Sequence, residues 1–274
     1  MSAIFVALSF FLEGILLSAE VVLALFANTP AFKLEPAIHH FALENAKSEG
    51  IIHPPTPALP RLRVRNPEES KPMESLGIDT NHLWNEPLSC DTMVRSLSYM
   101  KDGMKIRAGE NLGKLLHVDL WSATQVMDGR QDHVAQLDHA RKDSILKYFE
   151  IEYPKDTIFI TNIQLPGTPF VHVVCYWWLK AEILKAEDAA NFLTLWDKFC
   201  KIDQDDCAFQ NERFKLIPTI VDGPWLIRAT VPQKPAITGT KLTQRYFRGS
   251  NYMEVDMDIA SSTIAANIVS VCRG

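Results

Sequence analysis

The segment from Thr157 to Leu179 reads TIFITNIQLPGTPFVHVVCYWWL, and it decides the fold. Pro166 and Gly167 divide it into two apolar runs, and a Pro-Gly pair favours a tight turn with positive φ at the glycine. In the second run, alternate residues fall on two faces, and both faces are largely apolar. A strand of this kind is covered on both sides. The segment therefore predicts a β-hairpin whose second strand, residues 170–179, lies centrally in a sheet.

Outward from this hairpin, the pattern is mostly strands with a few helices. The expected strands are 94–100, 114–121, 157–165, 170–179, 225–231, 236–247 and 252–259. The expected helices are 135–147, 188–199, 207–214 and a final helix capped by Ser261 or Ser262. This order predicts the α+β class, with a curved antiparallel sheet, helices on one face and a C-terminal helix. A helix-grip-like closure is one arrangement that such an order can adopt.

Composition excludes some classes of protein. The 274 residues carry a formal net charge of −5 and no long run of lysine and arginine, which argues against a nucleic-acid-binding protein. The five cysteines are widely spaced without a Cys-x-x-Cys pair, so neither a disulfide scaffold nor a zinc module is indicated. Reduced thiols are typical of a cytoplasmic protein, which is the expected location.

Residues 3–27 form one apolar stretch that is interrupted by Glu13, Gly14 and Glu20. The two acids are seven residues apart and would share one face of a helix. The hydrophobic gain and the cost of two acids nearly cancel in a membrane. Three interpretations stay open: a membrane anchor or interfacial helix, a helix packed on the main domain, and a gene-model artefact. Membrane association is therefore expected through residues 3–27, if at all.

Three regions are predicted along the chain. Residues 1–50 hold the apolar segment and a short helix at 37–49, and residues 51–77 form a proline-rich linker. Prolines at this density oppose both helices and sheet ladders. Residues 78–274 form the folded domain.

An acidic stripe, Glu254, Asp256 and Asp258, alternates with apolar residues near the C-terminus. On a strand, the three carboxylates share one face. They could form a cation site or a charged docking stripe. The favoured interpretation is the solvent-exposed face of an amphipathic strand, partly neutralised by basic residues across the hairpin. Those basic residues are Lys241, Arg245 and Arg248.

Aromatic residues gather in and beside the predicted sheet. Apolar packing accounts for most of them. The alternative is contact with a ligand or a membrane interface, because aromatic rings and a neighbouring arginine suit such a boundary. The candidates for that contact are Trp225, Tyr246, Phe247, Arg248 and Tyr252.

Motifs of known catalytic chemistry are missing from the sequence. It contains no Gly-x-Ser-x-Gly elbow, no P-loop, no Gly-x-Gly-x-x-Gly and no His-Glu-x-x-His. We therefore expect no catalytic residue, no metal site and no cofactor, and we predict that the chain is not an enzyme.

Several short motifs between Trp84 and Gly274 resemble the C-terminal domain of the plant Enhanced Disease Resistance 2 protein and its eukaryotic relatives. They are Asn162-Ile-Gln-Leu-Pro-Gly167, Phe209-Gln-Asn211, Arg213-Phe-Lys-Leu-Ile-Pro218, Gly223-Pro-Trp225, Tyr246-Phe-Arg-Gly249, Asn251-Tyr252, Asp256-Met-Asp-Ile259 and Ser261-Ser262. In the plant proteins this domain follows a PH domain and a START domain. We expect neither here, because the similarity already begins at Trp84.

The resemblance implies a setting of lipid and membrane traffic or signalling, and the family supplies no catalytic residues. The first expectation is therefore a non-enzymatic lipid- or membrane-associated module, with a lipid or membrane surface as the partner. The alternatives are a protein-interaction domain without a ligand cavity and, third, an uncharacterised enzyme. The sequence specifies no protein partner.

Overall fold

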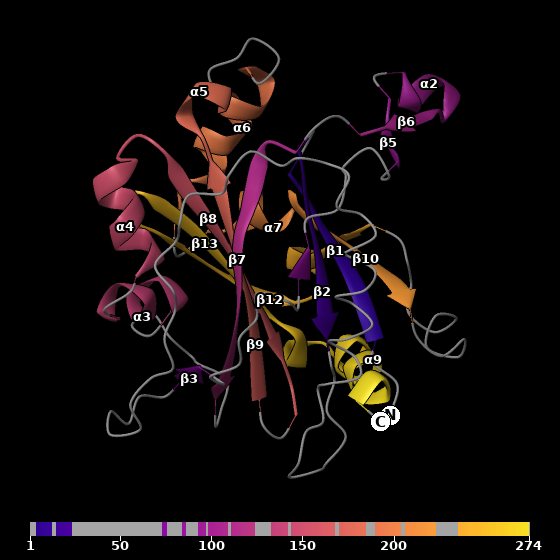
Figure 1. Ribbon diagram of the computed structural model, residues 1–274. Coiled ribbons are helices and arrows are strands. Elements are labelled where there is room, and N and C mark those ends of the chain that lie inside the picture. Colours follow the sequence, from indigo (N-terminus) through magenta and orange to yellow (C-terminus); the bar gives the residue numbers. More distant parts are fainter. Residues whose placement is uncertain are drawn as a thin grey trace, which may run out of the picture.

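The computed structural model describes residues 4–12, 15–23, 73–75, 84–85, 93–96, 98–108, 111–123, 133–141, 144–167, 170–184, 190–203, 206–222 and 235–273. Two sheets and a small hairpin make up its β structure. Helices lie against both faces of the larger sheet (Figure 1). The α+β class with an open, curved sheet is confirmed.

The larger sheet has six strands in the order β12-β13-β8-β9-β7-β3. They are β3 (Met73–Ser75), β7 (Gly113–Ala123), β8 (Thr157–Leu165), β9 (Phe170–Leu179), β12 (Thr243–Arg248) and β13 (Tyr252–Asp258). All neighbouring pairs are antiparallel except β8 and β13, which are parallel. This exception to the predicted antiparallel sheet arises because helices and two further strands connect β9 to β12, and parallel strands require such a crossover.

The central hairpin is confirmed at the predicted boundaries. Gly167 has φ 147° at the turn between β8 and β9. Every residue of β9 is buried. Both faces of β9 are apolar because each face packs into a separate hydrophobic core.

One core contains Trp177 and Cys175 of β9, Val255 of β13 and the aromatic residues of the helix that spans residues 190–199. The helices on this side are α6 (Ala190–Phe199), α7 (Ala208–Asn211) and α9 (Thr263–Arg273). Phe192, Trp196 and Phe199 of α6 are buried against the sheet.

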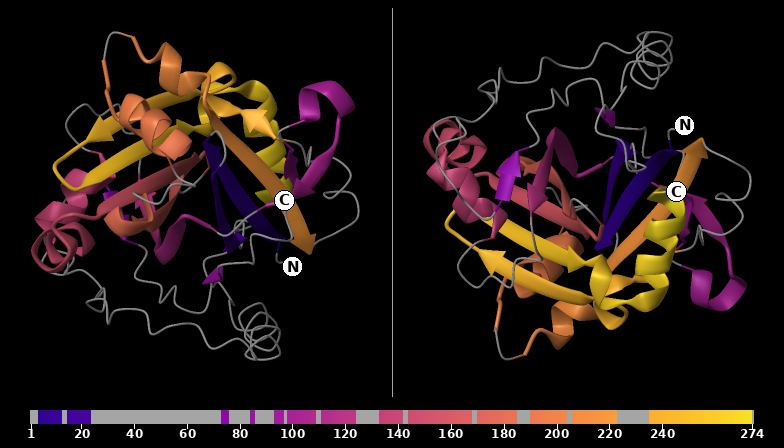
Figure 2. Two further views of the ribbon diagram at one scale, coloured as in Figure 1. Left: turned by 90° about the horizontal axis from the view of Figure 1, so that it is seen from above. Right: turned by 90° about the horizontal axis from the view of Figure 1, so that it is seen from below.

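The second core covers the opposite face of the sheet. It contains Tyr176 and Trp178 of β9 and Phe149 of the helical side. The helices here are α3 (Val134–Ala140) and α4 (Ile145–Glu152). Helices thus cover both faces, whereas the sequence analysis expected them on one. The views in Figure 2 show α3 and α4 together at one end of the molecule.

The smaller sheet corrects the interpretation of residues 3–27 as a helix. Its order is β11-β10-β1-β2-β4. The strands are β1 (Ile4–Leu12), β2 (Ile15–Leu23), β4 (Trp84–Asn85), β10 (Phe214–Asp222) and β11 (Ala236–Ile237). Leu12 pairs with Ile15, so the dipeptide Glu13-Gly14 alone separates β1 from β2. A two-residue connection containing glycine between two apolar runs is typical of a hairpin.

No helix in the described part of the chain is long and apolar enough to cross a membrane. The N-terminal segment contributes its apolar residues to a sheet instead. β1 pairs with β10, which comes about two hundred positions later and is therefore recruited by tertiary structure alone.

Several element boundaries differ from the prediction. The helix expected at 135–147 is two helices, because Arg141 and Ser144 lie between α3 and α4. The strand expected at 236–247 is interrupted by a 3₁₀ turn, η3 (Thr238–Thr240), before β12. In α9, Ala265 and Val269 pack against the core, whereas Ile264 is 76% exposed.

Some predictions lie outside the described residues. They are the helix at 37–49, the strand at 225–231 with Trp225, and most of the proline-rich linker. At the end of that linker, β3 pairs with β7 and forms one edge of the larger sheet.

Candidate functional site

The acidic stripe lies on β13 and is buried. The exposed fractions are 0% for Glu254, 4% for Asp256 and 9% for Asp258. The alternating Met253 and Val255 belong to the core on the other face, so the predicted alternation is confirmed. The expected solvent-exposed face is wrong, because α3, α4 and the polar residues of β8 and β9 share this side of the sheet.

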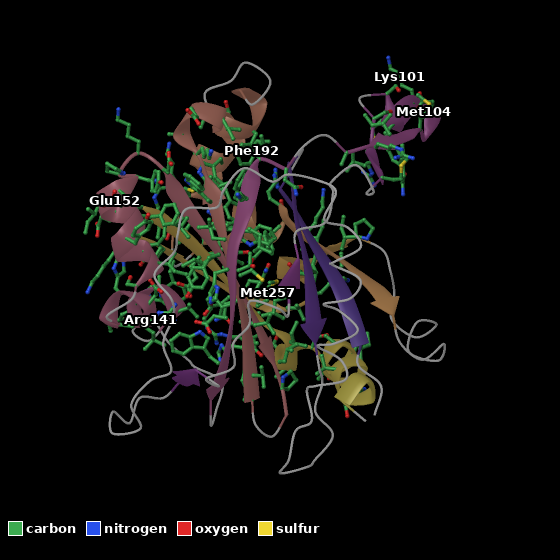
Figure 3. All side chains as sticks on the ribbon, in the orientation of Figure 1. Lys101, Met104, Arg141, Glu152, Phe192 and Met257 are labelled. Carbon is green, nitrogen blue, oxygen red and sulfur yellow. The ribbon has the colours of Figure 1, made fainter. Side chains whose placement is uncertain are left out.

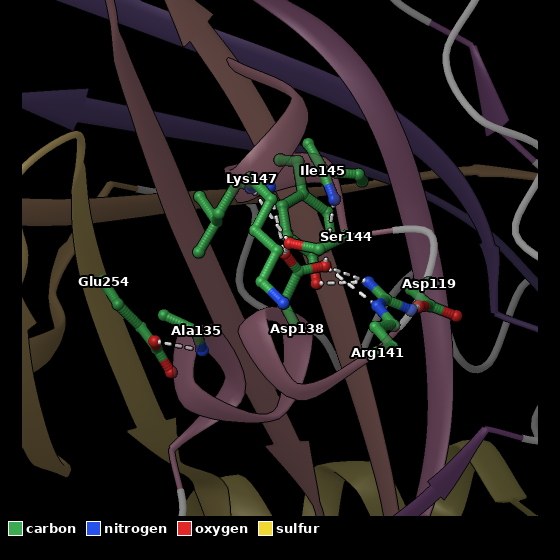
Figure 4. A network of polar contacts seen from close by, with 10 residues as sticks. Asp119, Ala135, Asp138, Arg141, Ser144, Ile145, Lys147 and Glu254 are labelled. Carbon is green, nitrogen blue, oxygen red and sulfur yellow. Dashed lines mark hydrogen bonds and ion pairs between the residues drawn. The ribbon is translucent and has the colours of Figure 1, made fainter. Parts of the chain in front are cut away.

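Glu254 caps a helix from a distant strand. Its Oε1 accepts the backbone N–H of Val134 at 2.8 Å, and its Oε2 accepts that of Ala135 at 2.8 Å. The Nδ1 atom of His133 lies 2.9 Å from Oε2. These N–H groups open α3, where a carboxylate is favoured by the partial positive charge of the helix end. Figure 4 shows the contact between Glu254 and Ala135.

Asp256 is the next carboxyl along β13, and two amides of β8 hold it. Asn162 Nδ2 donates to Oδ1 at 3.0 Å, and Gln164 Nε2 donates to Oδ2 at 3.3 Å. On β9, His172 Nδ1 lies 3.1 Å from Asn162 Oδ1. A buried polar chain therefore crosses three neighbouring strands from Asp256 to His172.

Burial changes the acidity of this pair. It raises the pKa of Glu254 to about 7, against the opposing effect of the Asp256 and backbone hydrogen bonds. Burial raises the pKa of Asp256 well above its ordinary value, and the adjacent Glu254 adds to the effect. Two charges this close in a buried site are unfavourable, so Asp256 keeps its proton while Glu254 is the group that ionises.

Asp258 has a local structural role. Its Oδ1 accepts the backbone N–H of Ala260 at 3.0 Å and so caps η4 (Ile259–Ser261). The three carboxylates therefore have three different sets of donors. Among the described residues, no group of three or more histidine, cysteine or acidic side chains could hold a metal ion.

A second polar network joins α3 and α4 to the sheet (Figure 4). Arg141 donates through Nη1 to Asp119 of β7 at 2.7 Å and through Nε to Asp138 of α3 at 2.9 Å. Its Nη2 donates to the hydroxyl of Tyr176 on β9 at 3.0 Å. One guanidinium thus connects two strands and a helix, which the planar, five-donor shape of arginine permits.

Asp138 also caps the following helix. It is fully buried, and its Oδ2 accepts the hydroxyl of Ser144 at 2.7 Å and the N–H of Leu146 at 3.0 Å. Ser144 Oγ in turn accepts the N–H of Lys147 at 3.0 Å. Glu254 and Asp138 therefore satisfy the first N–H groups of two successive helices, which would otherwise lack partners.

The predicted aromatic contacts divide between core and surface. Tyr246 is 1% exposed, and its hydroxyl donates to Asn211 Oδ1 at 2.9 Å. Phe247 is buried and stacks on His133 with ring centroids 4.2 Å apart. Arg248 is exposed, and Tyr252 is partly buried. Tyr246 and Phe247 therefore do not form part of an exposed face, and Trp225 lies outside the described residues.

Gly249 lies in the turn between β12 and β13. Among the described glycines, only Gly103 and Gly167 have a positive φ, so Gly249 does not adopt a left-handed backbone conformation. A Cβ atom built on Gly249 would lie 2.2 Å from Cε1 of Tyr252. The position therefore requires glycine for space, not for a left-handed backbone.

Among the residues whose exposure the structure describes, most of the exposed large apolar side chains lie in a projection that we call the arm. It consists of β5 (Met93–Arg95), α2 (Tyr99–Asp102) and β6 (Lys105–Arg107). Figures 1 and 2 show it at the opposite end of the molecule from α3 and α4. Four large apolar side chains of the arm are exposed: Met93 by 51%, Met100 by 86%, Met104 by 54% and Ile106 by 47%.

The arm is also basic. It contains four basic residues and one acidic residue, although the whole chain has a net charge of −5. Figure 3 labels Lys101 and Met104, whose side chains extend from this projection. The basic residues are Arg95, Lys101, Lys105 and Arg107.

Polar contacts hold the arm in shape. Asp102 Oδ1 accepts the N–H of Met104 at 2.8 Å, and Gly103 ends α2 with φ 68°. The Arg95 guanidinium lies 4.5 Å from the ring centroid of Tyr99. The exposed methionines are therefore displayed on an ordered tip. Apolar side chains exposed together are typical of an interaction surface.

Neither the amides of β8 nor Asp138 and Arg141 were singled out as site residues from the sequence. Asn162 and Gln164 gave a signal, since they occupy alternate positions in an otherwise apolar strand. Buried polar residues on one strand face require partners, and that face could have been matched with the acidic stripe. Asp138 and Arg141 gave no comparable signal, because they lie three residues apart in an ordinary polar segment.

Comparison with known proteins identifies the family. The family model described as "Protein ENHANCED DISEASE RESISTANCE 2, C-terminal" matches residues 84–274. A protein of Arabidopsis thaliana, "Protein ENHANCED DISEASE RESISTANCE 2-like", is 33% identical over 181 residues, which are 66% of this chain and 22% of that protein. No solved structure matches. The β8–β9 hairpin, the acidic stripe and the arm all lie in the matched region, and the chain belongs to the family of the ENHANCED DISEASE RESISTANCE 2 C-terminal domain.

Proposed function

We propose that this chain is a non-enzymatic module that associates with membranes, and that it does so through the arm. The observation that supports the proposal is the exposure of Met100 and Met104 beside basic residues on one ordered projection. The lipid setting that the family resemblance implies agrees with it. The aligned region spans 22% of the plant relative, so nothing of that protein's whole activity is transferred.

The chemistry of the arm suits an anionic bilayer. Methionine and isoleucine side chains gain free energy when they leave water for the acyl region. Lysine and arginine have long apolar stems that let their charged heads stay at the lipid headgroups. Each basic residue near an anionic surface contributes about 1 kcal/mol to binding. The negative charge of the rest of the chain favours an approach to such a surface through the arm.

The buried carboxylates support a non-enzymatic role. Glu254 accepts three hydrogen bonds from the start of α3, and Asp138 accepts bonds from the start of α4. These acceptors stabilise helices and join them to the sheet. A general acid or base needs a position within hydrogen-bonding distance of a substrate, and these side chains face other parts of the chain.

Vesicle flotation tests the proposal. We expect the full chain to float with vesicles of phosphatidylcholine and phosphatidylserine and to bind more weakly to phosphatidylcholine alone. The double variant Lys101→Glu/Lys105→Glu should weaken binding by about tenfold or more, because two favourable charges become unfavourable. Raising the salt concentration from about 0.1 M to about 1 M shortens the Debye length from about 10 Å to about 3 Å and should also release the protein.

Met100→Asp tests the apolar contribution, and Ile151→Asp is its matched control. Ile151 is 75% exposed on α4, away from the arm, so its replacement should leave binding unchanged. Equal losses in both variants would contradict the assignment to the arm. If the unaltered chain fails to float with the anionic vesicles at about 0.1 M salt, membrane association itself is wrong.

A further inference from the structure

Three buried polar side chains form a row across the α3–α4 face of the larger sheet. Gln164 of β8 pairs with His172 of β9, and His172 pairs with Trp121 of β7. Residues directly opposite on antiparallel strands point to the same face, with Cβ atoms about 5 Å apart. Gln164 and His172 are 0% exposed, and Trp121 is 3% exposed. We call these three residues the polar row.

The hydrogen bonds fix the proton position on His172. Asn162 Nδ2 donates to Asp256, so Asn162 Oδ1 is left to accept from His172 Nδ1. The Nδ1 atom therefore carries the proton, and Nε2 carries a lone pair. Burial lowers the pKa of His172 to about 4, which keeps the ring neutral at physiological pH. Nε2 of His172 is thus a hydrogen-bond acceptor.

The other two groups are fixed in the same way. Gln164 Nε2 donates to Asp256 Oδ2, so Gln164 Oε1 is a second acceptor. Trp121 Nε1 can only donate. Within the described part of the chain, no residue forms a hydrogen bond with Gln164 Oε1, His172 Nε2 or Trp121 Nε1. Two acceptors and one donor, all buried, thus belong to residues that are paired across three neighbouring strands, although buried polar atoms in proteins are nearly always hydrogen-bonded.

The charged side chains near the polar row restrict which kind of ligand could pair with its three unpaired atoms. Asp256 and Asp258 of β13 share this face. Asp119 lies two residues before Trp121 on β7, so its side chain is on this face as well. The Arg141 guanidinium lies 5.0 Å from the Trp121 ring centroid, but its donors are used by Asp119, Asp138 and Tyr176. An anion would meet carboxyl groups without a free cation among these residues.

A cation is also a poor match for the polar row. An ammonium group could donate to His172 Nε2 and Gln164 Oε1, but it has no lone pair for the indole N–H of Trp121. A hydroxyl group both donates and accepts, and neighbouring hydroxyls of one molecule can serve both acceptors. The pattern is therefore complementary to uncharged hydroxyl groups.

We propose that the polar row binds an uncharged, hydroxyl-bearing small molecule, which donates to His172 Nε2 and Gln164 Oε1 and accepts from Trp121 Nε1. The hydroxyls belong to a soluble polyol or to the glycerol moiety of a neutral lipid. This site is distinct from the arm, and it does not depend on membrane association.

The indole N–H signal of Trp121 in nitrogen-15 NMR spectra of the full chain tests the proposal. Trp121→Phe assigns the signal by removing it. The probes are glycerol, 1-hexanoylglycerol and trihexanoylglycerol. The first two carry neighbouring hydroxyls, and only the last lacks a hydroxyl. We expect a saturable shift of the Trp121 signal with a hydroxyl-bearing probe and none with the full ester. Saturation by glycerol identifies a polyol site, and saturation by the monoacylglycerol alone identifies a lipid site.

Two variants remove the acceptors. His172→Phe and Gln164→Leu should each weaken binding of the effective probe by about tenfold or more, because each leaves a donor of the ligand unpaired. Gln210→Leu is the matched control. Gln210 is also buried with an unpaired Oε1, but it lies in the other core region and bonds to Phe199 and Lys201. Its variant should keep full affinity despite a comparable change in stability.

Three results would overturn the proposal. The first is an unchanged Trp121 signal with both hydroxyl-bearing probes, which would mean that water alone meets these groups. The second is an equal shift with trihexanoylglycerol. The third is unaltered affinity in folded His172→Phe and Gln164→Leu chains, with folding verified by the retained dispersion of the remaining indole signals.

Discussion

At the scale of single residues, the turn between β12 and β13 depends on the contact between Gly249 and Tyr252. The ring of Tyr252 occupies the space that a Cβ atom of residue 249 would need. The rings of His133 and His139 are its neighbours, with centroids 6.1 Å and 6.0 Å from that of Tyr252. Its freedom to move aside is therefore limited. A short distance, and not an unusual φ, explains glycine here.

Gly249→Ala should lower the free energy of unfolding by about 1–3 kcal/mol, the usual cost of inserting a methyl group into a packed site. Chemical denaturation measures it. In the Tyr252→Ala background, the same substitution should cost close to nothing, since the ring is gone. Gly103→Ala is the control, because its cost arises from φ 68° with nothing within 4 Å, and it should not depend on Tyr252. A Gly249→Ala cost that persists without the ring would refute the steric explanation.

At the scale of elements, Arg141 joins α3 and α4 to the sheet. Its three partners come from β7, α3 and β9, and two of them are buried carboxylates. Removing the guanidinium would leave Asp119 and Asp138 without their shared cation. An unpaired buried charge costs far more than a lost surface ion pair.

Arg141→Met should therefore lower the free energy of unfolding by about 3–5 kcal/mol. Hydrogen exchange should show faster exchange in α3 and α4 than in the β8–β9 hairpin, because Arg141 holds these helices against the sheet. Arg213→Met is the comparison: its pair with Glu212 is 3.2 Å long, and Glu212 is 64% exposed, so about 1 kcal/mol or less is expected. Uniform acceleration across the sheet in Arg141→Met would contradict this division of roles.

At the scale of the whole molecule, the buried titratable groups make stability depend on pH. The pKa of Glu254 is raised to about 7 and that of Asp256 well above its ordinary value, both by burial first. In the unfolded chain, these groups ionise near pH 4. The folded chain thus holds more protons between about pH 4 and 7, and this contribution destabilises the fold as pH rises. His172 acts oppositely, because its pKa is lowered to about 4.

Asp256→Asn isolates one of these contributions. The variant has no proton to retain, so its free energy of unfolding relative to the unaltered chain should rise with pH, by about 1.4 kcal/mol per pH unit between about pH 5 and 7. Denaturation curves across that range measure it. Asp102→Asn is the control: its difference should stay constant between about pH 5 and 7 and change, with the opposite sign, only below about pH 4, because the N–H of Met104 lowers the pKa of Asp102. A difference between Asp256→Asn and the unaltered chain that is constant with pH would contradict the raised pKa.

Local pattern was sufficient for the hairpin and for much of the element order. Alternation in residues 157–179 predicted β8 and β9 at their observed limits, and the run from Asp188 predicted α6 within two residues. Local pattern failed for residues 3–27, because apolar residues without clear periodicity fit a helix and two buried strands equally well. The pairing of β1 with β10 decides between them, and it is a contact between distant segments.

The candidate site shows the same division more sharply. The sequence by itself placed Glu254, Asp256 and Asp258 on one face of one strand, because strand periodicity is a local property. It could not decide whether that face meets water. The tertiary structure decided this, since the donors to Glu254 come from residues about 120 positions earlier and those to Asp256 from β8. A carboxylate can be buried only where donors replace its hydration, and the fold alone brings those donors together.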